Sequence, residues 1–360
     1  MMNLKLNSNI HNYEVSFENN FDFFDDLLKI NKKVFVIDKN VYKIYKKLFK
    51  NIKSDELFLL DAVEGKKTLK SVEKIYKFLA TKDAKRNITM ISIGGGITQD
   101  VTGFAASTAY RGIKWIFLPT TFLSQADSCI GSKTSLNFET YKNILGGFYP
   151  PHKIYVQPDF LQTLTTKDFY SGVGEIVKFA LLNENYPKDF NSIIKMLENV
   201  KFGKKRLETI KKTMEVKKAY IDEDEFDAGK RNLFNYGHCF GHALENSSHY
   251  KIPHGIAVTI GMIYSNIVSL NRNLISKKQF KFLNKKLFLP NIYMKLNIKL
   301  FDKNILLESM KNDKKRVGKD LTIVIPCDDE IRAVKIDDLT FKEFEKAYNK
   351  LMRILGLNDK

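Results

Sequence analysis

The sequence predicts an α/β N-terminal domain with a Rossmann-like parallel sheet and a mainly α-helical C-terminal domain. Up to about residue 160, short apolar, β-branched runs alternate with amphipathic stretches, a pattern typical of a parallel sheet covered by helices. Beyond that point the apolar residues recur at helical spacing. A chain of 360 residues is long for a single core, so we expect two domains, 1–160 and 161–360.

Apolar runs and helical spacing predict the individual elements. One crossover helix is expected over 68–82, where Leu69, Val72 and Ile75 share a helical face. The strands expected in the first domain are 34–38, 57–61, 88–93, 114–119 and 153–157. The helices expected in the second are 166–182, 203–221, 231–249, 254–272 and 340–355, beside a β-hairpin of 321–326 and 331–336.

A glycine-rich turn joins the predicted strand 88–93 to a helix. Its sequence is GGGITQDVTGF (94–104). Glycines permit close backbone approach, and the free N–H groups at a helix start favour a pyrophosphate. The turn departs from G-x-G-x-x-G, so a dinucleotide site and tight strand–helix packing both fit it. Asp38, at the end of the first strand, is either a ribose or adenosine partner or a simple turn residue.

Histidines gather in the segment RNLFNYGHCFGHALE (231–245) and just after it. His238 and His242 are four residues apart on one face of the predicted helix, and His254 follows nearby. Imidazoles spaced in this way often bind a divalent metal. Such pairs also cap helices, pack or form hydrogen bonds, so the spacing alone leaves both interpretations open. Arg231 is expected to open the same helix.

Polar residues are dense in the segment 119–151, which is bounded by core-like sequence. Asp127, Lys133, Lys142 and Asn143 lie there among small residues, as they would in a cleft.

Further along the chain, GEIVK (174–178) places Glu175 and Lys178 one helical turn apart, and Lys217 precedes Arg231 by fourteen positions. A surface location is the alternative for each lysine taken singly. Together, these residues could form an anion-binding pocket beside a metal.

Composition restricts the class of protein. The net charge of +18 is spread along the chain without a long basic run, which favours a lysine-coated surface over a nucleic-acid-binding module. A field of that sign would steer anionic substrates towards the protein. Cys129, Cys239 and Cys327 are odd in number and far apart, which indicates reduced thiols in a cytoplasm. We find no secretory signal and no long apolar run, so we expect no membrane association.

Taken together, these strings resemble the 3-dehydroquinate synthase family, within the sugar phosphate cyclase superfamily. The resemblance extends from about residue 38 to residue 315, in order and with similar spacing. The motifs that carry it are GGGxxxDxxGF, RG(V/I), PTT, DSxxGxKT, KNxxGxF, (A/G)E(V/I)xK, RxLxNxGHxxGHAxE, HGxA and DKK. It implies a dehydroquinate synthase-like fold with NAD on 1–160, and with a divalent metal (zinc or cobalt) and substrate on 161–360.

The resemblance also implies roles for individual residues. The metal ligands would be Glu175, His238 and His254, which makes His242 a pocket residue instead of a ligand. NAD contacts would come from Asp38, Glu64, Lys67, Gly95, Gly96, Asp100, Thr120, Thr121, Phe160 and Thr163. Substrate contacts would come from Asp127, Asn143, Lys178, Lys217, Arg231, Asn235, His242 and Lys314, while Lys133 and Lys142 would serve both ligands. Arg111 would reach the phosphate site of a neighbouring subunit, which implies a homodimer.

The implied substrate is 3-deoxy-arabino-heptulosonate 7-phosphate. The implied reaction is transient oxidation at C5, β-elimination of phosphate, reduction and an intramolecular aldol closure, so that NAD is regenerated. Lys133, Asn143 and Arg111 would bind the phosphate, and Lys217 and Arg231 would bind the carboxylate.

Three positions depart from the family pattern: Gln99, Ser132 and Tyr141. They leave open a paralogue that cyclises sedoheptulose 7-phosphate, glucose 6-phosphate or another sugar phosphate. Those two named substrates lack a carboxylate, so the presence of Lys217, Arg231 and Asn235 favours the heptulosonate. Metal-dependent alcohol and glycerol dehydrogenases are more distant alternatives, and they lack this set of lysines.

Overall fold

The computed structural model describes residues 3–83, 85–139, 141–312 and 320–357. It divides into two compact units, one of Met1–Leu164 with Lys218–Phe226 and one of Thr165–Lys217 with Asp227–Lys360. The first unit is α/β with a mainly parallel sheet and the second is mainly helical, so the predicted fold class is confirmed. Within the described ranges, none of the helices combines the length and the apolar character needed to span a bilayer.

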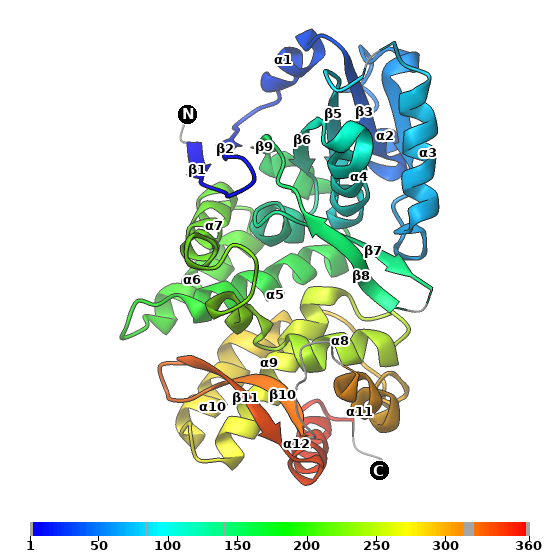
Figure 1. Cartoon of the computed structure of the whole chain (residues 1–360). Helices are drawn as coiled ribbons and strands as arrows, with labels where there is room; N and C mark the ends of the chain where they lie inside the picture. The colour runs from blue at the N-terminus through cyan, green and yellow to red at the C-terminus, as the bar shows by residue number, and fades with distance from the viewer. Residues whose placement is uncertain (1–2, 84, 140, 313–319, 358–360) are drawn as a thin grey trace. The chain divides into compact units, whose positions relative to one another are not determined.

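A seven-stranded sheet forms the centre of the first unit, with the order β1-β2-β9-β6-β5-β3-β4 (Figure 1). β1 pairs with β2 antiparallel, and all the other neighbours pair parallel. The strands are β1 (Asn3–Leu6), β2 (Tyr13–Phe17), β3 (Lys33–Asp38), β4 (Leu57–Leu60), β5 (Thr89–Gly94), β6 (Lys114–Pro119) and β9 (Lys153–Val156). All five strands predicted for this part of the chain are present. The antiparallel pair β1–β2 was not predicted.

Alternate residues of the central strands face opposite sides of the sheet, as a period of two requires. One side packs on α1 (Phe23–Lys29) and on the apolar residues that follow α2 (Lys39–Ile44), around Phe35, Ile37 and Ile93. The other side is covered by α3 (Leu69–Ala80) and α4 (Gly96–Thr108), which lie side by side (Figure 1). The helix predicted over 68–82 is α3. Burial on both faces explains why these strands are almost continuously apolar.

The strand order fixes the place of a ligand site on this sheet. The chain leaves β3 towards β4 on one side, and then continues from β5 to β6 on the other side. Ligands of open α/β sheets bind where the strand order reverses in this way, beyond the carboxyl ends of the strands. Asp38 ends β3 and Gly94 ends β5, so the predicted turn lies at that point.

A two-stranded hairpin occupies the polar segment in which no strand was predicted. It consists of β7 (Lys133–Phe138) and β8 (Tyr141–Phe148), and α4 packs against β7. The register shifts between Leu136 and Phe138. Its residues are largely polar or glycine and half exposed, so period-two patterning did not reveal it.

The second unit is built from helices and one β-hairpin. Its helices are α5 (Thr166–Leu182), α6 (Phe190–Lys201), most of α7 (Arg206–Glu223), α8 (His238–Ser247), α9 (His254–Asn271), α10 (Lys277–Leu283), α11 (Lys303–Lys311) and α12 (Phe341–Ile354). The hairpin pairs β10 (Leu321–Pro326) with β11 (Ala333–Leu339). The predicted helices are present except that 231–249 is not one helix. Lys230–Asn235 is a 3-10 helix, and Gly237 at φ 79° separates it from α8, so Arg231 does not open the helix of the histidines.

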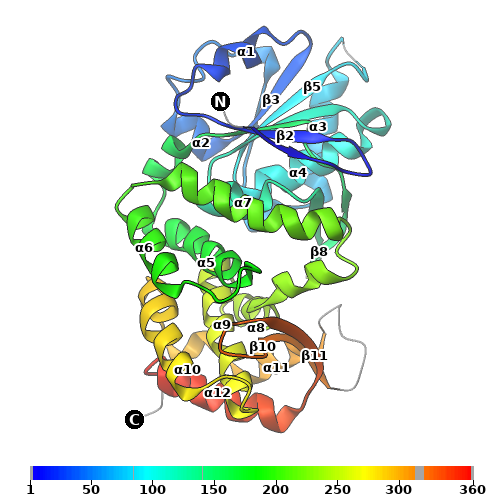
Figure 2. The ribbon, with the colours of Figure 1, turned by 90° about the vertical axis from the view of Figure 1, so that its left-hand side faces the viewer.

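The buried helix α9 organises the second unit and packs on α5, α8, α12 and β10 (Figure 2). Residues 255–269 are all buried and most of them are apolar, so this stretch of the helix has no side that faces solvent. Two glycines allow α5 and α9 to touch. A Cβ on Gly174 would lie 2.0 Å from the carbonyl oxygen of Gly255, and one on Gly255 would lie 1.7 Å from that of Ser171. This contact places Glu175, one residue after Gly174, beside His254 at the start of α9.

Candidate active site

A cluster of one carboxylate and three imidazoles lies where α5, α8 and α9 meet. Oε1 of Glu175 is 3.5 Å from Nε2 of His238 and 3.3 Å from Nε2 of His254. One ligand nitrogen from each of His238, His242 and His254 lies within 4.8 Å of the others. Both the histidine pair seen in the sequence and the Glu–His–His set implied by the resemblance therefore meet at one point.

In His254 and His238, the nitrogen Nδ1 lies close to an oxygen atom of a neighbouring residue. Nδ1 of His254 lies 3.1 Å from Oε2 of the buried Glu245, and Nδ1 of His238 lies 3.3 Å from the carbonyl oxygen of Tyr236. In the form that would bind a metal, with the proton on Nδ1 alone, each ring would present the lone pair of Nε2 to the side of Glu175. A carboxylate or carbonyl behind a histidine is the usual outer support of a metal ligand.

The electrostatics of the cluster are dominated by burial and by charged neighbours. Burial, reinforced by the ammonium of Lys178, holds the pKa of His238 well below its usual value, so this ring is neutral. Burial also disfavours the charged form of His254, but the carboxylates of Glu245 and Glu175 outweigh it and raise the pKa to about 10. Without a metal this ring is therefore protonated, and a bound cation would displace the proton of Nε2. Burial favours protonation of Glu175, yet Lys178 and His254 hold its pKa well below the usual range. The carboxylate is therefore charged.

These residues fit a divalent metal. Both carboxylate oxygens of Glu175 are buried without a well-formed hydrogen bond, although Lys178 lies 2.5 Å from Oε2. Ligands about 2.0–2.1 Å from a tetrahedral zinc lie roughly 3.3–3.4 Å from one another. The 3.3 and 3.5 Å separations of Glu175 from His254 and His238 match that spacing, whereas they are long for hydrogen bonds to a carboxylate.

Basic side chains predicted to bind substrate are also found in the second unit. Lys178, Lys217 and Arg231 are buried, with exposed fractions of 2%, 6% and 4%. Lys178 lies over the rings of Phe179 and Phe234 as well as beside Glu175. Because they are buried, these three cations are not part of the exposed surface of the protein. Such groups are rarely buried without anionic or aromatic partners, which is consistent with a role in binding an anion. Asn235 is half-buried and His242 is exposed.

The predicted phosphate-binding turn has the expected geometry. Gly95 precedes α4 with no side-chain cap, so the first N–H groups of this helix have no capping side chain. A Cβ on Gly95 would lie 2.8 Å from Cγ2 of Thr121, and this contact leaves room only for glycine. Asp38 accepts a hydrogen bond of 2.7 Å from the N–H of Asn40 and so caps α2. This hydrogen bond is what a turn residue would make at that position. A contact between Asp38 and a nucleotide stays a prediction.

Three of the residues predicted to contact NAD or substrate are joined in one network, and two more form a pair. Nζ of Lys67 lies 2.5 Å from Oδ2 of Asp100 and 2.6 Å from Oδ1 of Asn143. Glu64 lies 3.6 Å from Nζ of Lys142. The network ties the segment before α3 to α4 and to β8.

Most of the remaining predicted residues lie on loops and short helices of the first unit, and Lys133 begins β7. Thr121 and Ser124 exchange hydrogen bonds at the start of the π-helix Ser124–Ser128, which carries Asp127. Thr163 lies 3.1 Å from the hydroxyl of Tyr45, and Phe160 is buried. Lys133 and Arg111 are exposed, and Thr120 is buried. Lys314 lies outside the described residues.

Some residues of these networks were not predicted. Glu245 is the last residue of the GHAxE string, seven positions after His238, and that spacing on one helical face was its only signal. The N–H of Ser135 donates to Asp100 at 2.9 Å. Ser135 and Asn137 follow Lys133 at alternate positions of β7. Because this strand was not predicted, the alternation could not be used to find them.

Comparison with known proteins agrees with this geometry. A family model described as 3-dehydroquinate synthase N-terminal matches residues 57–171, and one described as 3-dehydroquinate synthase C-terminal matches 172–316. The 3-dehydroquinate synthase of Clostridium tetani is 35% identical over 358 residues, which cover 94% of this chain and 90% of that protein.

Two solved structures share the fold. One is ValA, the 2-epi-5-epi-valiolone synthase from Streptomyces hygroscopicus subsp. jinggangensis with NAD+ and Zn2+ bound (TM-score 0.82, 22% identity, 97% of this chain and 98% of that one). The other is 2-deoxy-scyllo-inosose synthase complexed with carbaglucose-6-phosphate, NAD+ and Co2+ (TM-score 0.79, 22% identity, 97% and 100%). The fold is thus that of the sugar phosphate cyclases. Within this class, the chain belongs to the 3-dehydroquinate synthase family.

Proposed function

We propose that this protein is a 3-dehydroquinate synthase, which converts 3-deoxy-arabino-heptulosonate 7-phosphate into 3-dehydroquinate and phosphate in the shikimate pathway. Membership of the family supports the reaction. The observation that carries the proposal is the buried carboxylate of Glu175, which lies 3.3 and 3.5 Å from two histidine nitrogens.

The cofactors are NAD and one divalent metal ion, zinc or cobalt. Glu175, His238 and His254 would hold the metal, and the glycine turn before α4 would bind the pyrophosphate of NAD. When bound, NAD supplies a reversible hydride acceptor, and the metal supplies a Lewis acid. Glu64, Lys67 and Asp100 are the polar residues assigned to the remainder of the dinucleotide.

The charged residues of the chain then bind and orient a substrate that carries both a carboxylate and a phosphate. Lys217 and Arg231 suit its carboxylate, and Lys133 and Asn143 suit its phosphate. Charge-assisted contacts at both ends of a flexible molecule restrict it to one pose, which lowers the entropic part of the barrier. The positive field of the protein favours encounter with such a substrate.

The three departures from the family pattern leave these charged groups in place. Ser132 adopts φ 67°, a region that favours the glycine usual at this position. Gln99 is buried and exchanges two hydrogen bonds of 2.7 Å with Ser128. Tyr141 is exposed at the start of β8. None of the three side chains replaces a cation assigned to the substrate, which supports the heptulosonate over a substrate without a carboxylate.

A homodimer in the cytoplasm belongs to the same proposal. Arg111 is exposed and lies in a short segment where Tyr110, Arg111 and Gly112 all have positive φ. A guanidinium displayed in this way suits the phosphate site of a second copy of the chain.

The test is metal-dependent release of phosphate from 3-deoxy-arabino-heptulosonate 7-phosphate with catalytic NAD and added zinc or cobalt. Sedoheptulose 7-phosphate runs in parallel, and chelated enzyme is the control. We expect release from the first substrate without net NADH. Release from sedoheptulose 7-phosphate alone would identify a paralogue, and accumulation of NADH would indicate a dehydrogenase.

A further inference from the structure

Asn137 on β7 lies at the register shift of the β7–β8 hairpin. Leu136 pairs with Leu145, but Phe138 pairs with Tyr141, so the regular ladder is broken between Leu136 and Phe138. A residue at such a break does not follow the ladder and can be directed to another partner. Asn137 is half-buried, and neither its spacing nor the family motifs gave it a role.

One side of Asn137 holds the segment before α3. Its backbone N–H donates to the carbonyl oxygen of Lys67 at 2.8 Å. Its side-chain Nδ2 donates to Oε1 of Glu64 at 2.9 Å and lies 3.3 Å from the carbonyl oxygen of the same residue. Glu64 and Lys67 are two residues assigned to NAD, and both belong to this segment.

The opposite side of the same amide holds β8. Oδ1 of Asn137 accepts a hydrogen bond of 3.1 Å from the backbone N–H of Asn143. Asn143 has φ 53°, a left-handed conformation that costs free energy for a residue other than glycine. The broken register leaves this N–H without its regular cross-strand acceptor, and the side chain of Asn137 takes that place.

Lys67 makes a second link between the segment before α3 and β8. Its Nζ lies 2.6 Å from Oδ1 of Asn143, which also accepts from the hydroxyl of Ser135 at 3.0 Å. Glu64, Lys67, Asn137 and Asn143 therefore form a closed ring of contacts within the first unit. A shift of either segment must be transmitted to the other, because a single planar amide contacts both.

We propose that Asn137 is a positioning residue that couples the binding of NAD to the binding of the substrate phosphate. The inference rests on the proposed function. Its amide donates to the segment assigned to NAD, and its carbonyl orients the segment assigned to phosphate. Binding of either ligand orders this shared amide, so that the second ligand meets a segment already held in place.

Two substitutions separate the two sides of the amide. Asn137→Asp keeps an acceptor for the N–H of Asn143 but loses the donor to Glu64 and places two carboxylates together. It should raise the Kd for NAD at least tenfold, with a smaller rise in the KM for substrate. Asn137→Leu removes donor and acceptor, and should raise both constants and abolish the coupling. Asn51→Asp, an exposed change in the same unit, is the matched control.

A double-mutant cycle of Glu64→Gln and Asn137→Asp measures the interaction energy between these two residues in NAD binding. A merely structural role of Asn137 would not give such an energy. Glu64→Gln alone should weaken NAD binding. In the Asn137→Asp background it should weaken binding less or restore it, because the repulsion is removed and an amide donor faces Asp at position 137. Calorimetric titration of NAD, with and without substrate analogue, measures Kd and coupling, and thermal unfolding checks each fold. If the Asn137→Leu protein does not fold, the double-mutant cycle with Asn137→Asp tests the inference by itself.

Additive effects in this cycle, or constants within twofold of the Asn51→Asp control, would overturn the inference and leave the proposed function intact. Failure of the unsubstituted protein to bind NAD would instead overturn the proposed function, and the inference with it.

Discussion

Glu245 lies 3.1 Å from Nδ1 of His254, on the side of the imidazole that faces away from Glu175. His254 is thus held between two carboxylates, of which only Glu175 lies on the Nε2 side. The ring orientation needed for a metal ligand therefore exists in the folded chain itself. Its origin is the pairing of α8 with α9, since Glu245 is on the first helix and His254 begins the second.

Glu245→Gln should weaken zinc binding about 10–100-fold, because the amide can still accept the hydrogen bond but no longer supplies charge behind the ring. Competition with a fluorescent zinc chelator would measure the affinity. Glu73→Gln, on the exposed face of α3, is the control and should leave zinc affinity unchanged. Equal affinities for the Glu245→Gln and unsubstituted proteins would show that this carboxylate does not support a metal ligand.

His238→Ala should lose the metal and the activity together, whereas His242→Ala should keep the metal and lose turnover. The reason is that His238 presents Nε2 to buried Glu175, while His242 is exposed and is assigned to the substrate. Metal content after dialysis and phosphate release would be measured on the same samples. His249→Asn is the control, since asparagine tolerates the left-handed backbone found there. An active, metal-free His238→Ala protein would refute its role as a ligand.

Lys217→Ala should lower kcat/KM by a factor on the order of 100 while NAD binds almost normally, because a buried cation opposite the substrate carboxylate is lost. Steady-state kinetics and calorimetry would separate the two effects. Lys212→Ala removes an exposed lysine of the same helix and should behave as the unsubstituted protein. A matching loss of NAD affinity in Lys217→Ala would mean that the residue acts on the fold.

Gly255→Ala should destabilise the protein by about 3 kcal/mol or more, since the new methyl would overlap the backbone of α5 and force two buried helices apart. Urea unfolding measures this. Gly147→Ala, where a Cβ meets nothing within 4 Å, is the comparison. Similar unfolding midpoints for the two variants would contradict the close approach of α5 and α9.

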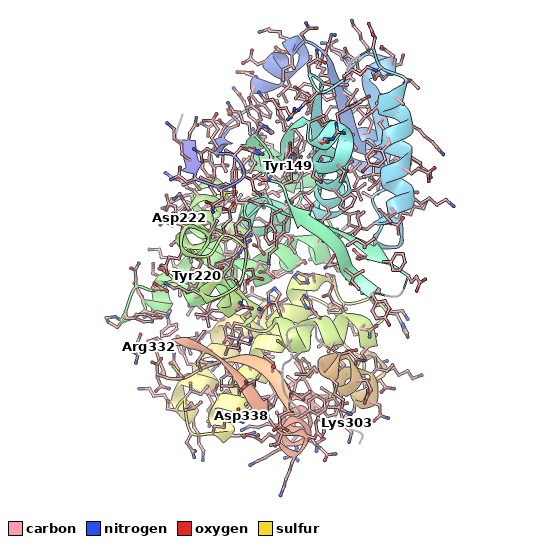
Figure 3. The ribbon with its side chains drawn as sticks, in the orientation of Figure 1. Tyr149, Tyr220, Asp222, Lys303, Arg332 and Asp338 are labelled. Carbon is pink, nitrogen blue, oxygen red and sulfur yellow. The ribbon has the colours of Figure 1, made fainter. Side chains whose placement is uncertain are left out.

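The stability of the second unit should depend on pH through Glu343. Hydrogen bonds from Arg272, at 2.7 and 3.0 Å, lower the pKa of Glu343 to about 2 from its ordinary 4.5. Arg272 also binds Asp338, which Figure 3 shows on β11. Because the folded-state pKa is depressed, this contribution is complete above pH 4.5 and is lost as the pH falls towards 2.

Glu343→Gln should therefore lower the free energy of unfolding by about 1 kcal/mol at pH 7. The difference from the unsubstituted protein should narrow below pH 4.5, which urea unfolding at a series of pH values would measure. A difference that does not change with pH would show that the charge of Glu343 is not the stabilising feature.

Much of the fold followed from patterns along the chain. The strands β3, β5 and β6 are buried on both faces, so each is a continuous apolar run bounded by turn residues. The β7–β8 hairpin could not be predicted in this way, because its strands are stabilised by hydrogen bonds and by contact with α4 more than by an alternating apolar face. The break before α8 could not be predicted because Tyr236 fits the helical period. Only the left-handed conformation of Gly237 separates the 3-10 helix from α8.

The sequence by itself determined the apolar strands of the parallel sheet, the longer helices, their order and the chemical types of the site residues, since each of these depends on local pattern and spacing. Only the tertiary structure decided that Glu175 meets His238 and His254, that Glu245 supports one of the rings, and that Asn137 joins Glu64 to Asn143. Such contacts link residues far apart in the chain or across an irregular register. They depend on backbone approach at positions such as Gly174 and Gly255, which no local pattern reveals.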